Sequence, residues 1–120
     1  MSLDVLRPAS SYFQDWLPDV DCFDTLNGIR IKAELPGCVK ENVKIEFRDG
    51  NLVLSGSREP KLIPDGTVLV RERNFGKFSR DIFLPNGCQV DQIQARFDEG
   101  VLDIFVPRLE SMVPKRIQVE

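Results

Sequence analysis

A chain of 120 residues, of which 42% are hydrophobic and 29% charged, has enough apolar sequence to bury the core of one soluble domain. Its formal net charge of −3 disfavours nucleic-acid binding, which usually depends on a basic surface. The chain has no histidine and no glycine motif for phosphate binding, so we expect neither an enzyme nor a cofactor.

Residues 1–17 differ from the rest of the chain, because large apolar side chains recur there at helical spacing. We expect a short N-terminal arm whose spacing is compatible with a short helix and which contacts other subunits or other proteins. The alternative is an arm that folds back over a sheet of its own domain. The contact residues would be Tyr12, Phe13, Trp16 and Leu17.

From residue 28 onward, apolar and polar residues alternate, which is the pattern of half-buried β-strands. The predicted strands cover 28–35, 43–48, 51–57, 67–72, 77–85, 93–97 and 101–107. The strongest hairpin signal is Asp49-Gly50, and Glu99-Gly100 predicts another turn. We therefore predict an all-β protein, an immunoglobulin-like antiparallel β-sandwich without a long helix after Pro18.

The cysteines and the N-terminus indicate the compartment. Cys22, Cys38 and Cys88 are odd in number and widely spaced, which predicts reduced thiols in or near the core and no metal site. No segment is apolar enough for a membrane span, and the first residues lack the apolar stretch of a signal peptide. We expect a cytoplasmic protein with no membrane span.

Several segments together resemble one known family. AELPGCVKENVKIEFRDGNLVLSG is similar to the beginning of an α-crystallin domain, and RERNFGKFSRDIFLP is similar to its middle. ARFDEGVL matches the A-x-x-x-x-G-V-L signature of that domain. The chain therefore resembles the small heat-shock proteins. The resemblance implies an N-terminal arm over 1–17, an α-crystallin domain over 18–108 and a C-terminal extension over 109–120.

The resemblance also implies how the end of the chain is used. Members of the family end in an I-x-I/V motif that docks into a groove of a neighbouring subunit, and Ile117 and Val119 match this motif. The alternative is an extra edge strand within the same domain. The groove residues implied by the resemblance are Val43, Ile45, Phe47, Ile93, Ala95 and Phe97.

The long segment after residue 58 resembles the bacterial and plant type of the family. In that type a small strand in a loop crosses to the sheet of a partner subunit and forms the dimer. Arg80 matches a basic position of the dimer interface, and the alternative for it is an ordinary solvated strand charge. The crossing strand would consist of Thr67, Val68, Leu69, Val70 and Arg71.

The resemblance implies an ATP-independent holdase, which binds partly unfolded proteins and prevents their aggregation as an exchangeable homo-oligomer built from dimers. Its partners would be copies of itself and non-native client proteins, held by the arm residues and by the groove. Two alternatives remain: a co-chaperone adaptor like the CS-domain proteins, and a structural assembly subunit with little client binding. The arm is shorter than is usual in the family, which predicts smaller assemblies and client binding that is either weaker or more selective.

Overall fold

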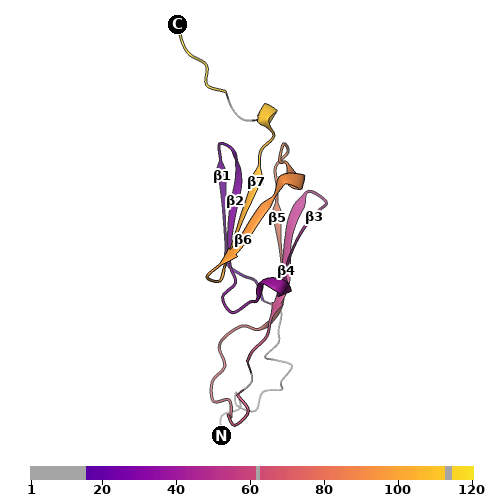
Figure 1. The fold of residues 1–120 in the computed structure, drawn as a ribbon, viewed down its shortest axis with the longest axis vertical. Coiled ribbons are helices and arrows are strands. Elements are labelled where there is room, and N and C mark those ends of the chain that lie inside the picture. Colours follow the sequence, from indigo (N-terminus) through magenta and orange to yellow (C-terminus); the bar gives the residue numbers. More distant parts are fainter. Residues whose placement is uncertain (1–15, 62, 113–114) are drawn as a thin grey trace.

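The computed structural model describes residues 16–61, 63–112 and 115–120, and in these ranges it is a sandwich of two antiparallel sheets (Figure 1). One sheet has the order β1 (Val20–Thr25), β2 (Gly28–Glu34), β7 (Val101–Pro107) and β6 (Gln94–Asp98). The other has the order β3 (Val43–Arg48), β4 (Asn51–Arg58) and β5 (Gly76–Phe83). Short 3-10 turns cover Lys40–Asn42, Val90–Gln92 and Glu110–Met112. The predicted all-β sandwich is confirmed.

The core follows directly from the alternation of side chains along the central strands. In β2, Ile29, Ile31 and Ala33 are buried while the residues between them are exposed. Strand β7 pairs with β2 and buries Ile104 between two further apolar residues of the same face. Leu54 on β4 supplies the opposite layer. Each fully buried aliphatic side chain of this kind contributes about 1.5–3 kcal/mol relative to an exposed one.

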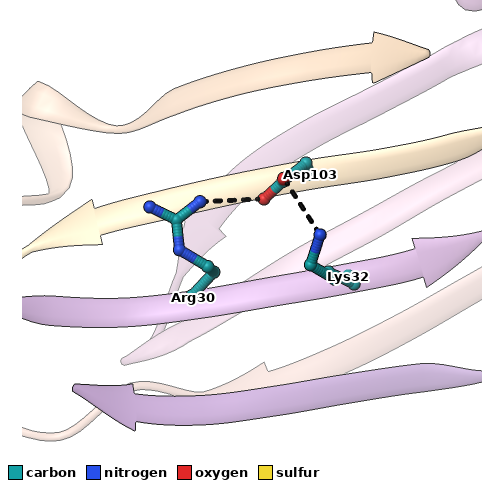
Figure 2. Close-up of polar contacts among 3 residues, drawn as sticks. All are labelled: Arg30, Lys32 and Asp103. Atoms are coloured by element: carbon teal, nitrogen blue, oxygen red, sulfur yellow. Dashed lines mark hydrogen bonds and ion pairs between the residues drawn. The ribbon is translucent and has the colours of Figure 1, made fainter.

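The outer face of the larger sheet carries cross-strand ion pairs (Figure 2). Lys32 on β2 lies directly opposite Asp103 on β7, and Arg30 lies two residues away on the same face. Both cations approach Asp103 at 3.3 Å, one at each carboxylate oxygen. Because these side chains are partly solvated, each pair adds less than about 1 kcal/mol. Their position favours the observed register of β2 against β7.

Two tight turns confirm the hairpin predictions. Asp49 and Gly50 both have positive φ angles, 52° and 82°, and join β3 to β4. Glu99 and Gly100, with φ angles of 51° and 79°, join β6 to β7 in the same way. Positive φ at both central positions matches the twist of the flanking strands, so these turns fix the two registers.

Strand β1 was not among the predicted strands. It pairs with β2 through a two-residue connection, with Thr25 opposite Gly28. All but one of its residues are exposed, and Asp24 occupies a position that faces the same side as buried Ile29. The acidic residues interrupt the apolar alternation, so local sequence carries little strand signal here. Pairing with β2 supplies the backbone partners instead.

The strand predicted over 67–72 is not formed within this chain. Residues 59–75 instead make a long loop between β4 and β5, beyond one end of the sheets (Figure 1). A strand requires a neighbour for its N–H and C=O groups, and the loop does not run beside an edge of its own domain. The prediction of a strand formed with a partner subunit concerns another chain and stays a prediction.

Candidate assembly and client-binding surfaces

Strands β3 and β6 are edge strands of different sheets, and both pack against one core cluster. The register shows which side chains face that core. Ile45 lies opposite buried Leu54, and Phe97 lies opposite buried Leu102. By the same alternation, the inward-facing residues of the two strands are Val43, Ile45, Phe47, Ala95 and Phe97.

These inward-facing positions are incompletely covered. Phe47 is 46% exposed although it lies opposite Leu52, which is fully buried. Ala95 is exposed although it lies opposite fully buried Ile104. Ile93, directly before β6, is half-buried against the same core. The structure thus places all predicted groove residues at two edges that share one core, while docking of a tail there stays a prediction.

The C-terminal residues lie away from this edge (Figure 1). Residues 115–120 form no strand, and Ile117 and Val119 are 84% and 91% exposed. An extra edge strand within the same domain is therefore not found in this part of the chain. Before the tail, the Leu109 N–H donates to the Gly87 carbonyl at 2.6 Å, and Met112 packs against Gly87. The chain is held to the domain up to Met112.

The loop 59–75 presents apolar side chains to solvent. Leu69 and Val70 are each 74% exposed. The candidate receiver for such a segment is β1, which has β2 as its only strand neighbour in the described part of the chain. The opposite side of β1 therefore offers backbone groups for an additional strand.

Arg80 does not project from the outer face of its sheet. It lies on β5 opposite buried Leu54, hence on the inward-facing side, and is half-buried. Its Nη1 donates to the Pro18 carbonyl at 3.1 Å, and the ion pairs among the described residues do not include it. The guanidinium thus supports the segment that enters β1, and its role in a dimer interface stays a prediction.

The arm residues differ in their placement. Trp16 is half-buried, and the centre of its ring lies 5.2 Å from the centre of the Phe78 ring. This residue is therefore placed as the alternative of a folded-back arm requires. Leu17, by contrast, is 65% exposed. Tyr12 and Phe13 lie outside the described residues. Client binding by these four side chains stays a prediction.

The three cysteines are free thiols in different surroundings: Cys22 is exposed, Cys88 half-buried and Cys38 buried. Burial is the main cause that raises the pKa of each thiol, and the Asp24 carboxylate adds to the effect on Cys22. Arg58 opposes the rise at Cys38. A raised pKa leaves less of the reactive thiolate at neutral pH, which does not favour a redox switch.

Other kinds of site were sought in the same residues. Within the ranges 16–61, 63–112 and 115–120, no group of three or more cysteine or acidic side chains is placed to hold a metal ion. None of the helical turns described there is long and apolar enough to cross a bilayer. A concavity of about 550 Å³ lies over the smaller sheet near Lys44, Ser55 and Lys77, and Val43 on edge strand β3 contributes to its lining.

Comparison of the sequence with known families gives a match over residues 21–120 to the Hsp20/alpha crystallin family. The 16.9 kDa class I heat shock protein 1 of Oryza sativa subsp. japonica is 34% identical, over 99% of this chain and 89% of the rice protein. Heat shock protein 16 of Schizosaccharomyces pombe is 32% identical, over 86% of this chain and 75% of its own length.

Solved structures give the same comparison in three dimensions. Heat shock protein 16.0 from Schizosaccharomyces pombe superposes with a TM-score of 0.74 at 30% identity, covering 88% of this chain and 99% of that chain. A small heat-shock protein from Xylella fastidiosa, described as having a distinct high order structure, gives a TM-score of 0.73 at 32% identity. It covers 88% of this chain and 97% of its own.

Proposed function

Because the chain belongs to the Hsp20/alpha crystallin family of small heat-shock proteins, we propose that it is an ATP-independent holdase. It binds partly unfolded proteins and prevents their aggregation, as an exchangeable homo-oligomer built from dimers in the cytoplasm. The observation that carries this proposal is the pairing of an incompletely covered apolar edge with an exposed apolar tail. Phe47 at that edge is 46% exposed, and Ile117 and Val119 in the tail are almost fully exposed.

The energetics of the tail suit a reversible contact. Burying one isoleucine and one valine yields about 3–6 kcal/mol together, which reaches only the lower end of the free-energy cost of lost freedom on association, about 4–15 kcal/mol. A single tail is therefore weak alone. Within a dimer or larger assembly the effective concentration of tails reaches about the millimolar range, so several weak contacts hold the oligomer while each can open. An opened groove then offers its apolar residues to a client.

The anchored base of the extension limits where a tail can bind. The chain is held up to Met112, so the first docking residue, Ile117, lies at most about 18 Å from the Met112 Cα at about 3.6 Å per residue. The groove that receives the tail lies within this radius. The assembly is thus restricted to arrangements that bring the β3–β6 edge of one subunit close to Met112 of another.

The dimer forms when the loop residues 67–71 of one subunit add a strand to the open side of β1 in the other. Charge supports this choice of edge, because exposed Asp21 lies on β1 while Arg71 and Arg73 lie in or beside the crossing segment. Opposite charges across neighbouring strands favour pairing. Arg80 donates a hydrogen bond to the carbonyl of Pro18, two residues before β1, and therefore lies near this contact.

The arm supplies further client contacts, with Leu17 the most exposed apolar residue of its described part. Tyr12 and Phe13 contribute in the same way, whereas the Trp16 ring is available to a client only when it leaves Phe78. No step of this activity requires catalysis, nucleotide or metal.

Light scattering from a client protein that aggregates on heating tests the proposed function. Without ATP, the protein should suppress scattering when present at about one subunit per client molecule. Substitution Leu17→Ser should weaken this suppression, and Lys61→Ser, at another exposed position, serves as the control. Absence of suppression by the folded wild-type protein would contradict the holdase and leave an adaptor or a structural assembly subunit.

A further inference from the structure

Arg58 is a charged residue buried at the base of the loop that is proposed to form the dimer. It is the last residue of β4 and pairs with Gly76, the first residue of β5, so the two residues close the loop 59–75. Arg58 is only 8% exposed, and it is the single charged side chain that is buried among the described residues. A buried cation requires compensation for its lost hydration.

That compensation comes from backbone carbonyls. Nη1 donates to the Pro36 carbonyl at 2.6 Å, and Nε donates to the Asn74 carbonyl at 2.9 Å. Nη2 donates to Asn74 as well. None of the ion pairs of the described residues involves Arg58. Burial lowers the pKa of the guanidinium, and nearby Arg73 adds to the effect. Arg58 thus connects the turn at Pro36 to the end of the loop without a neutralising carboxylate.

The face of the guanidinium is covered by the arm. Its central carbon lies 4.2 Å from the centre of the Trp16 ring and 5.5 Å from that of Phe75, which follows Asn74 in the loop. The indole N–H of Trp16 donates to the Gly76 carbonyl at 3.1 Å, and its backbone N–H donates to the Lys77 carbonyl at 3.1 Å. Trp16 therefore touches both the buried cation and the residues where the loop ends.

We infer that Trp16 and Arg58 form a latch that couples the N-terminal arm to the dimer loop. While Trp16 covers Arg58, water is kept from the guanidinium, and its hydrogen bonds hold Asn74 and the loop end in place. When a client draws the arm away, the guanidinium becomes hydrated, its bonds to the loop weaken, and the loop leaves the partner subunit more readily. This inference rests on the proposed client role of the arm and dimer role of the loop.

The coupling acts in both directions, because a coupling free energy between two sites is reciprocal. A loop held by a partner keeps Asn74 in place and so favours the seated Trp16. A free subunit has a looser loop and a more available arm. The latch would thereby link client binding to subunit exchange, two properties that the sequence assigns to separate segments of the chain.

Hydrogen exchange of the backbone amides tests the latch without any client. Trp16→Ala should speed exchange at residues 74–77 by about tenfold, the loss expected from removing a cation–aromatic contact and its hydrogen bonds. Leu17→Ala is the matched control, because Leu17 is adjacent but 65% exposed, and it should leave these amides unchanged. Trp16→Phe should restore part of the protection, since it keeps an aromatic ring over Arg58.

The second readout is the fluorescence of Trp16, the only tryptophan of the chain. Addition of a tryptophan-free client should shift its emission to longer wavelengths while the exchange of subunits between oligomers accelerates about tenfold. Arg58→Lys retains the charge but not the flat guanidinium, so it should shift the emission and accelerate exchange before any client is added. This variant also tests the latch if Trp16→Ala does not fold.

Two results would overturn the latch. One is that the amides of residues 74–77 exchange at the same rate in Trp16→Ala as in the wild type, or at the same rate in Arg58→Lys as in the wild type. The other is accelerated subunit exchange on client binding without a change of Trp16 emission. Because the amide measurement uses no client, it decides the latch even if the protein fails to suppress aggregation, so the two proposals fail separately.

Discussion

Gly56 illustrates how the close approach of another segment restricts the type of residue that fits at one position. It lies on β4 between Val43 and Phe78 of the neighbouring strands. A Cβ added there would overlap the carbonyl oxygen of Asn42 and lie 2.9 Å from the Phe78 ring. The backbone of the turn before β3 cannot move away without disturbing the strand that it begins, so only a residue without a side chain fits.

Gly56→Ala should therefore lower the free energy of unfolding by about 2 kcal/mol or more, through overpacking. Gly50→Ala is the control, because no atom lies within 4 Å of its added Cβ and only its φ angle of 82° opposes the change. That backbone strain should cost about 1–2 kcal/mol. Urea unfolding followed by circular dichroism compares the two. A smaller loss for Gly56→Ala than for Gly50→Ala would refute the close-approach explanation.

The thiols allow a second test at this scale. Because the pKa of Cys22 is raised by burial and by Asp24, its thiolate is the minor form throughout the neutral range. The rate of its alkylation by iodoacetamide should rise about tenfold per pH unit from pH 7 to pH 9 without levelling off. Mass spectrometry of the labelled peptide measures this rate, with an unfolded Cys22 peptide as reference. If the alkylation rate reached a plateau at a lower pH than in the unfolded reference peptide, this would contradict the raised pKa of Cys22.

At the scale of elements, the most informative feature is that residues 67–72 form no strand within the single chain. The sequence alternation at 67–72 predicts a strand, yet no strand forms there because no edge of the same domain lies beside it. Strand β1 has the complementary property, with weak local pattern and one open side. Both properties support the proposal that this strand is completed by association with another copy.

Replacing both Val68 and Val70 by proline should convert dimers into monomers, because proline removes two N–H donors from the crossing segment. The fold of each subunit should be unchanged, since this segment is not a strand within the chain. Ile63→Ser, at a 76% exposed position of the same loop, is the control. Sedimentation velocity measures the mass. Intact dimers in the double variant would show that the loop does not form the contact.

The whole molecule is organised with its two proposed assembly segments at opposite ends. The loop 59–75 extends from one end of the sandwich, and the C-terminal residues leave from the other (Figure 1). Contacts made at one end are therefore separate in space from contacts made at the other. We expect the dimer and the larger oligomer to be lost independently.

Substitution of Ile117 and Val119 by serine should reduce the larger oligomer to dimers and leave the dimer intact. The expected cause is loss of about 1.5–3 kcal/mol of burial for each tail residue. Gln118→Ser is a matched control, because alternation turns its side chain to the other face of an extended tail. Size-exclusion chromatography with light scattering measures both species. Persistence of the large oligomer would exclude the tail as its link.

The sequence by itself determined the central strands and the two hairpin turns, because side-chain alternation and turn residues act locally. Only the tertiary structure decided the rest. Strand β1 exists through its pairing with β2, and the strand predicted at 67–72 lacks such a partner within the chain. The burial of Arg58 arises where Trp16, Pro36 and Asn74 meet, and no local pattern reports a contact among segments so far apart in sequence.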